Sequence, residues 1–465
     1  MPSAFLSFQD FDIARQEGAL INFIPKAIEN HLASELYLNA IESEKYFMGE
    51  NPRLARYSAV MQVEDRAVEL FPRIRVPSGI FRRHITLLVN RLWYNGVQLD
   101  TPEQKLKLGK YFDKIAMSAH INAAIHSVAY GFWNYDHLQA FTVKEYFPLV
   151  DEGSSMHMAG IRFWQIAEDK PKIIELYELD GMTKFKQVGN GPLEIMIPKR
   201  AYRLTVRDYS AAGLGIDVID GENYPGFPVV PIYSNERHIS ELTPPVKAKI
   251  DVYDVLTTSF LDDAIKTKAI YWLLSGMSGN EEYLMSVKNA IQRLGIIAPN
   301  DPNVNAEAAT VTLSLDKIIL TLDWIKKEIH SDMIVMDPNE ITARSITNVA
   351  IQTNSYAMDT KTSEMDWQAS LFTQQILNLA GIDSKTIVFK QKTISNDLEI
   401  SQRLAMYPDV DLETKLRLDP LFPDDDIPAI LDRVALDQLS VNPNEPVSPE
   451  PAQPIDQSQQ PGAAA

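Results

Sequence analysis

A long amphipathic helix with many charged residues is the feature that most constrains how this chain folds. It follows the apolar segment 227–233 and the polar turn 234–237, and its apolar seam consists of Val246, Ile250, Tyr253, Leu256, Phe260, Ala264 and Tyr271. These spacings are close to the helical period, and a helix of about 28 residues is roughly 42 Å long. Such a helix buries little apolar surface by itself. We therefore expect it to pack along a long antiparallel neighbour or against copies of itself.

A second long helix is predicted after residue 314. Ser314 is a suitable N-terminal cap, and one side of the helix carries Ile318, Ile319, Leu322, Ile325 and Ile329. Between the two helices, the turn residues 275–280 interrupt the pattern, and residues 281–313 mix a short helix at 283–294 with strand-like segments at 295–297 and 309–313. The sequence therefore predicts two antiparallel helices bridged by a small α/β element.

The residues before the first long helix divide into a helical part and a strand-rich part. Helices are expected from about residue 25, where Pro25 suits a first turn, to Gly49, and over 80–93 and 102–130, because apolar residues recur at helical spacing between capping residues. Over 131–233, β-branched and aromatic residues alternate between turns. The fold class is therefore α+β, with an antiparallel sheet beside a helical platform.

The C-terminal part is expected to begin with a polar loop, because Pro338 ends the second long helix. A long helix that Gly381 ends, a strand and three short helices follow the loop. These elements are expected, in order, at 339–352, 354–380, 386–390, 397–407, 411–418 and 428–436. Prolines and polar residues after 440 predict a disordered tail.

Charge and composition exclude several classes of protein. The chain has 44 Lys and Arg against 62 Asp and Glu, a net charge of −18, whereas sequence-independent DNA binding needs basic side chains that displace counterions. No apolar run reaches the roughly 18 residues of a membrane span, no secretory signal is evident, and there is no cysteine. We expect an acidic, soluble protein of a reducing compartment that does not bind DNA tightly.

Four short blocks of sequence occur in a defined order. They are Gly160-Ile-Arg-Phe-Trp-Gln165 with Glu175-Leu-Tyr177 and Asp180-Gly181; Pro228-Val-Val-Pro231 with Ser234-Asn235; Ser240-Glu-Leu242 with Ile250-Asp-Val-Tyr-Asp254; and the segment 388–411. In order and spacing they resemble the Gp6-like family of portal proteins of tailed double-stranded DNA phages. Those proteins form the ring through which DNA enters and leaves a capsid.

The resemblance implies a portal fold that accounts for the whole chain. Its parts would be a wing of helical platform plus antiparallel sheet (1–244), a first stem helix (245–274), a small α/β clip (275–313), a second stem helix (314–336), a tunnel loop (337–353), a long wing helix with a returning strand (354–396), a helical crown (397–440) and the disordered tail (441–465). An ordinary helical hairpin with a decorated tip is the alternative for the stem and clip.

The resemblance also implies that two sets of residues lie along the path of the DNA. In the tunnel loop, the residues expected to meet the DNA backbone are Arg344, Ser345, Thr347 and Asn348. On the first stem helix, the residues expected to line the channel are Asp262, Asp263 and Lys266. For Arg344 the alternative is a surface arginine paired with Asp337 or Glu340. An acidic wall suits a conduit because it repels phosphates weakly, although an acidic soluble surface explains the same charge.

The partners implied by the resemblance are those of a head–tail connector. The chain would form a homo-oligomeric ring, typically a dodecamer of about twelve copies. The ring would dock the terminase and the head-completion or adaptor proteins, contact the major capsid and scaffold proteins, and let double-stranded DNA pass without specific binding. We expect it in the virion at the portal vertex of the capsid, and in the host cytoplasm during assembly, with no membrane partner.

No catalytic, cofactor or metal site is predicted, so the chain is not expected to be an enzyme. It lacks a Gly-x-x-x-x-Gly-Lys-Ser/Thr phosphate loop, a His-Glu-x-x-His pair and a nucleophile elbow. His120 and His126 are six residues apart, not the three or four that place two ligands on one helix face. Two alternatives remain open: another ring-forming connector, and, less favoured, a hydrolase whose active-site residues are scattered along the sequence.

Overall fold

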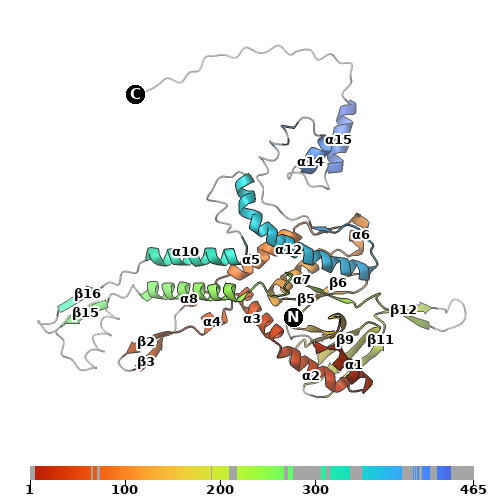
Figure 1. The fold of residues 1–465 in the computed structure, drawn as a ribbon, viewed down its shortest axis with the longest axis horizontal. Coiled ribbons are helices and arrows are strands. Elements are labelled where there is room, and N and C mark those ends of the chain that lie inside the picture. The colour runs from red at the N-terminus through yellow and green to blue at the C-terminus, as the bar shows by residue number, and fades with distance from the viewer. Residues whose placement is uncertain are drawn as a thin grey trace, which may run out of the picture. The chain divides into compact units, whose positions relative to one another are not determined.

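The computed structural model describes residues 6–63, 66–70, 74–189, 191–208, 217–266, 271–275, 305–309, 315–335, 348–389, 402, 404, 406–407, 411–418 and 427–440. The chain divides into two compact units, which consist of Met1–Arg344 with Thr353–Thr393 and of Ser345–Gln352 with Ile394–Ala465. Each unit is considered by itself. The first unit mixes helices and sheets, which confirms the α+β class (Figure 1).

The N-terminal part of the first unit is mostly helical. Its helices are α1 (Phe8–Gln16), α2 (Leu20–Leu32), α3 (Glu35–Met48), α4 (Pro52–Ala55), α5 (Ile80–Trp93), α6 (Pro102–Lys107) and α7 (Phe112–His126). Gly49 has a φ of 79° and ends α3 in the left-handed conformation, as predicted. Thr101 and Gln104 form a capping box at the start of α6. Local capping chemistry therefore sets these boundaries.

Four details of this part differ from the prediction. The helix expected from about residue 25 to Gly49 is two helices, because Ser34 caps the start of α3. Pro25 lies inside α2, because that helix begins at Leu20. The helix expected over 102–130 is interrupted between α6 and α7, where Gly109 takes a φ of 85° that helices do not use. Strands β2 (Ala59–Val63) and β3 (Arg66–Leu70) form an antiparallel hairpin that the sequence analysis did not predict.

The strands of the predicted sheet region form several sheets. The largest has the order β1-β7-β8-β9-β10-β11 and is antiparallel except for β1, which runs parallel to β7. Its strands are Leu6–Ser7, Tyr146–Val150, His157–Trp164, Lys172–Glu178, Gly181–Gln187 and Leu193–Arg200. A three-stranded sheet has the order β14-β5-β6, with strands Val229–Ile232, Ala129–Trp133 and Leu138–Thr142, and a hairpin joins β12 (Arg203–Asp208) to β13 (Asp217–Glu222).

Two apolar cores hold the first unit together. In the smaller core, α1 and α2 cover the six-stranded sheet and bury Phe11 and Ile24 beside Ile161. The larger core lies among the three-stranded sheet, α5, α7 and the long helix α12 (Asn348–Ala380). At Gly131 of β5, a Cβ atom would lie 2.6 Å from the ring of Phe372 on α12, so this close approach of helix and strand requires glycine.

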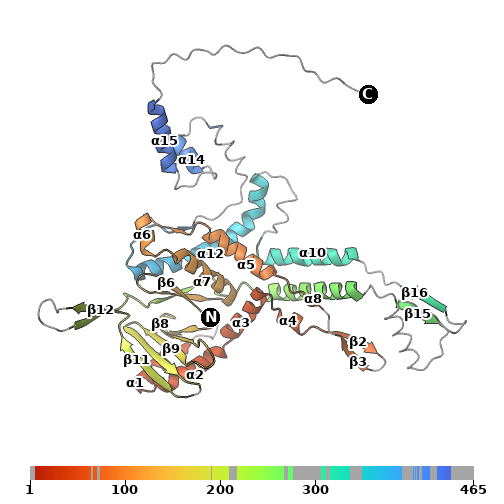
Figure 2. The same cartoon turned by 180° about the vertical axis from the view of Figure 1, so that it is seen from behind.

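The predicted pair of long helices is present. Helices α8 (Pro244–Lys266) and α10 (Leu315–Asp332) run side by side and extend away from the sheets (Figures 1 and 2). Strands β15 (Tyr271–Ser275) and β16 (Asn305–Ala309) pair among the residues that connect them. The first helix is shorter than the predicted 245–274, because the aromatic and aliphatic run of β15 suits a strand. The segments predicted at 283–294 and 295–297 lie outside the described residues.

Helix α12 begins earlier than the predicted residue 354. Its first residue is Asn348, so the last part of the predicted loop is helical, since no glycine or proline separates residues 348–353 from the rest of the helix. Gly381, with a φ of 66°, follows its end as predicted. Strand β17 (Val388–Phe389) then pairs with β4 (Val97–Gln98) and returns the chain to the N-terminal helices.

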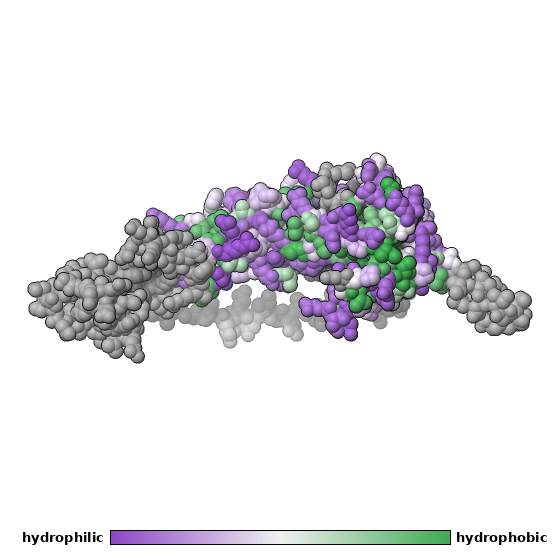
Figure 3. Space-filling view, turned by 90° about the horizontal axis from the view of Figure 1, so that it is seen from below, coloured by the Kyte–Doolittle hydropathy of each residue, from purple (hydrophilic) through white to green (hydrophobic). Residues whose placement is uncertain are grey.

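The second unit contains α14 (Leu412–Leu418) and α15 (Ile427–Ser440), at the positions predicted for short helices. The predicted tail after 440 lies outside the described residues, as does most of the helix expected over 397–407. Among the described helices, none has the length and apolar character needed to span a membrane. On the face of the molecule in Figure 3, hydrophilic residues cover much of the described surface, with apolar residues between them.

Candidate functional site

Apolar contacts and ion pairs hold α8 against α10 at the ends nearest the sheets. The buried apolar residues are Val246 and Ile250 on α8 and Ile325 and Ile329 on α10. Lys249 Nζ lies 2.9 Å from Asp332 and 3.0 Å from Glu328. Hydrogen bonds to these two carboxylates, that to Asp332 above all, raise the pKa of Lys249. The two helices are therefore fixed in an antiparallel arrangement at this end.

The buried face of α8 changes from apolar to polar along the helix. Side chains four residues apart are each at most 5% exposed, namely Val246, Ile250, Asp254, Thr258 and Asp262, and this spacing keeps them on one face. Tyr253, Leu256 and Phe260, which belong to the predicted apolar seam, are only half-buried. Tyr253 and Leu256 of the predicted seam still pack against the larger core, but beyond Ile250 the most buried positions of α8 are the polar Asp254, Thr258 and Asp262, which were not predicted.

Residues 46–78 supply the hydrogen-bond partners of this polar face. Asp254 accepts hydrogen bonds from the Asn51 side chain at 2.8 Å and from the Ser78 N–H at 2.9 Å. Thr258 Oγ1 accepts one from the Val76 N–H at 3.1 Å. Burial raises the pKa of Asp254, and the hydrogen bonds from Asn51 and Ser78 oppose that rise. Because buried polar groups need partners, α8 depends on this N-terminal segment.

The turn that leads from β14 into α8 is fastened by a buried charge network. Ser234 Oγ and Asn235 Nδ2 donate to Glu241 at 2.7 and 3.0 Å, and the same carboxylate lies 3.1 Å from Lys361 Nζ of α12. The side chains of Lys361 and Glu241 are 10% and 11% exposed, so water screens the pair little. Ser240 Oγ also donates to the Ile125 carbonyl at 2.7 Å. The blocks that contain Ser234–Asn235 and Ser240–Leu242 therefore connect β14, α7 and α12 at the start of α8.

A buried histidine pair connects α5 to α10. His84 Nε2 lies 2.9 Å from His330 Nδ1, and His84 Nδ1 lies 2.9 Å from Met333 Sδ. The two histidines are 0% and 5% exposed. When both rings are neutral, one of the facing nitrogens donates and the other accepts. The second long helix is thus tied to the N-terminal helices as α8 is tied to residues 46–78.

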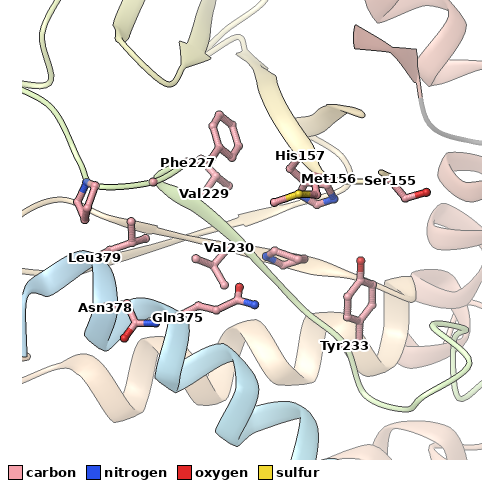
Figure 4. Close-up of a pocket in the computed structure, with 13 residues that line it drawn as sticks. Ser155, Met156, His157, Phe227, Val229, Val230, Tyr233, Gln375, Asn378 and Leu379 are labelled. Atoms are coloured by element: carbon pink, nitrogen blue, oxygen red, sulfur yellow. The ribbon is translucent and has the colours of Figure 1, made fainter. Parts of the chain in front are cut away.

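A cavity of about 560 Å³ lies among β14, the start of β8 and α12 (Figure 4). Its described lining consists of Ser155, Met156, His157, Pro225, Gly226, Phe227, Val229, Val230, Pro231, Tyr233, Gln375, Asn378 and Leu379. Burial lowers the pKa of His157 to about 4, which makes this histidine a weak general base at neutral pH. Figure 4 shows the Ser155 hydroxyl directed away from His157.

The two histidines considered as metal ligands, His120 and His126, are buried in the protein interior. His120 Nδ1 accepts a hydrogen bond from the Trp93 indole at 3.0 Å, and burial lowers the pKa of His120 to about 3 and that of His126 to about 4. In the part of the chain that the structure describes, no three or more His, Asp and Glu side chains are arranged to hold a metal ion.

The structure describes some of the residues predicted to lie along the DNA. Arg344, Ser345 and Thr347 are outside the described residues, and Asn348 is the first residue of α12. On α8, Asp262 is 5% exposed and faces protein in the single chain, whereas only the backbone is described for Asp263 and Lys266.

Two features of the site were not predicted from the sequence: the polar inner face of α8 and the role of Lys361. The four-residue spacing of Asp254, Thr258 and Asp262 was visible in the sequence, but a search for apolar residues passes over it. The sequence indicates only the local partner of Lys361, Glu364, because its other partner, Glu241, is far away in the sequence.

The chain is similar to one protein family and to several solved structures. The family model for the phage portal protein, SPP1 Gp6-like, matches residues 39–428. Similar solved structures include the neck of the native GTA particle computed with C12 symmetry and the neck of the empty GTA particle computed with C6 symmetry, each with 10% identity and a TM-score of 0.41. The virion of the native gene transfer agent particle has 11% identity and a TM-score of 0.42. In each case 74% of this chain and 90% of the other are covered. No curated protein matches.

Proposed function

Because the chain belongs to the SPP1 Gp6-like family of phage portal proteins, which are structural head–tail connectors, we propose that it forms a closed ring at one vertex of a capsid. A ring closes when one heterologous contact repeats by a fixed rotation, and we propose about twelve copies. The central hole is the conduit for packaging and ejecting double-stranded DNA. The family match over residues 39–428 is the observation that carries this proposal.

The described elements correspond to the parts of such a ring as follows. Helices α8 and α10 form the stem, and the element that contains β15 and β16 forms the clip, where terminase and head-completion proteins dock. The N-terminal helices, the sheets and α12 form the wing, and α14 and α15 belong to the crown. The antiparallel pair of long helices, with the paired strands β15 and β16 between its members, supports this assignment.

The channel wall is proposed to include the tunnel loop, with Arg344, Ser345, Thr347 and Asn348, and one face of the stem. A four-residue step places Lys266 on the same helix face as the buried Asp262, whereas Asp263 lies about 100° around the helix. Among the three stem residues that we predicted to line the channel, Asp263 is therefore the best placed to face DNA.

Electron microscopy and native mass measurement of the purified chain test the proposal. Closed rings with a hole wide enough for duplex DNA are expected. A protein that stays monomeric at all salt and protein concentrations, with and without scaffold protein, would count against it. A packaging assay with terminase separates a portal from another ring-forming connector, since only the portal supports entry of DNA into the capsid.

A further inference from the structure

A local excess of arginine stands out in this acidic chain. Residues 71–99 contain five arginines and neither Asp nor Glu, although the whole chain has a net charge of −18. Arg91 is buried and paired with Asp359. Three arginines of this segment, Arg75, Arg82 and Arg83, are exposed, and so are Arg53 and Arg56 shortly before it. Among the described residues, none of these five forms an ion pair.

Two hollows bring several of these cations together. A hollow of about 420 Å³ has Lys45, Arg56 and Arg75 in its wall. A second, of about 450 Å³, has Arg53, Arg56 and Lys247 in its wall, so Arg56 lies in both. The Arg82 guanidinium lies 5.8 Å from the centre of the Phe47 ring on α3, the helix that carries Lys45. We call Lys45, Arg53, Arg56, Arg75 and Arg82 the basic patch.

Two of the described carboxylates that line these hollows have partners of their own. Glu42 lies 2.7 Å from Lys247 Nζ, and Asp251 accepts a hydrogen bond from the Tyr46 hydroxyl at 2.6 Å. Glu50 also lines the smaller hollow and offsets one positive charge. The patch therefore keeps an excess of positive charge on guanidinium groups, whose planar fork matches phosphate oxygens.

We propose that the basic patch binds the phosphate backbone of duplex DNA. The choice of DNA rests on the proposed function, which brings DNA to this chain. Duplex DNA carries one charge per about 1.7 Å of its axis, so cations spread over two adjoining hollows meet several phosphates at once. Five cations and three carboxylates line the two hollows, and this excess of positive charge favours a polyanion over a protein surface of mixed charge.

The test measures the affinity for a fluorescent duplex DNA in a series from about 50 to 200 mM salt. The variant R53Q/R56Q/R75Q removes three patch cations, and K114Q/R237Q/K385Q removes three exposed cations that line neither hollow. The slope of log affinity against log salt should fall by about 0.9 for each lost phosphate contact. We therefore expect the patch variant to lose about 2 to 3 units of slope and to bind at least about tenfold more weakly at low salt, while the control behaves like the wild type.

The variant R53K/R56K/R75K keeps the positive charge, so its slope of log affinity against log salt should equal that of the wild type. It shows whether an effect of the glutamine variant comes from the lost charge or from a disturbed fold. Native mass measurement on the same samples shows whether each variant still assembles into rings. Equal slopes for the patch variant and the control would overturn the proposal, as would wild-type rings without salt-dependent binding. Loss of rings in the glutamine variant with no change of slope would assign the patch to a protein contact instead. A wild-type protein that forms no rings would count against the portal function itself.

Discussion

Buried histidines make the stability of this chain depend on pH. His126 is 2% exposed, and burial lowers its pKa to about 4. In the unfolded chain this histidine is protonated below about pH 6.5, whereas in the folded chain it is protonated only below about pH 4. The folded state therefore loses stability as the pH falls from 6.5 to 4. One pKa unit corresponds to about 1.4 kcal/mol, which gives a contribution on the order of 3 kcal/mol.

The variant H126Q tests this dependence. Between pH 7 and pH 4, the wild type should lose on the order of 3 kcal/mol more stability than the variant, because glutamine does not titrate. Urea unfolding at a series of pH values measures the difference. H137Q is the matched control, since the side chain of His137 is 48% exposed. Parallel curves for the wild type and H126Q would contradict the burial argument.

The Lys361–Glu241 pair gives a second prediction at the scale of single residues. K361M leaves the buried Glu241 carboxylate without its cation, and breaking a buried pair on one side typically costs about 3 to 5 kcal/mol. E241Q/K361M should recover part of that loss, because no buried charge is left uncompensated at this position. Thermal unfolding of both single variants and the double variant forms the test. Strictly additive losses would show that the two side chains do not interact.

Residues whose role is local could be predicted from the sequence. The left-handed conformations of Gly49 and Gly381 follow from their position after a helix. The roles of Asp254 and Lys361 could not be predicted, because their partners Asn51 and Glu241 are far away along the chain. A buried polar side chain is recognisable only when the distant group that satisfies it is known.

At the scale of elements, the contact of α12 with β5 can be tested at Gly131. In G131A the new Cβ atom would lie 2.6 Å from the Phe372 ring and 3.1 Å from Leu138. Overpacking of this kind costs about 1 to 3 kcal/mol, measured as a lower unfolding midpoint. G226A is the control, because its Cβ would meet nothing within 4 Å. F372L should restore part of the loss, and a G131A protein as stable as the wild type would refute this packing.

Helix existence was easier to predict than helix ends or inner faces. Periodicity located α5, α8, α10 and α12, because long helices repeat their pattern several times. It failed at β15, where a strand-forming run lies within the predicted helix, and at the β2–β3 hairpin. On the second half of α8 it located the apolar Tyr253 and Leu256, which pack against the larger core, but not the polar residues that hydrogen-bond to residues 46–78.

At the scale of the whole molecule, the order of short blocks along the chain allowed the family to be predicted, and the family match over 39–428 agrees. No single block was sufficient, since a block can equally serve packing, as the Ser234–Asn235 turn does. Residues along the DNA path could not be derived in the same way. They depend on how neighbouring copies meet, which the periodicity of one chain does not contain.

The variant D263K tests the proposed channel wall. A lysine there should attract DNA phosphates and slow packaging several-fold, since the wall would no longer repel them weakly. The measurement is the amount of DNA protected in capsids by terminase-driven packaging. D10K, at an exposed position on α1, makes the same change of charge elsewhere. If D263K rings package DNA normally, Asp263 does not line the channel.

The Ser234–Glu241–Lys361 network lies immediately before α8 and holds the first end of that helix in place. The direction of the whole helix therefore depends on this turn. The 23 residues of α8 correspond to about 34 Å, so a tilt of only about 5° at the turn would displace the far end by about 3 Å. A displacement of that size is enough to separate two surfaces that fit closely. How stiffly one turn is held therefore limits how accurately the distant tip can be positioned.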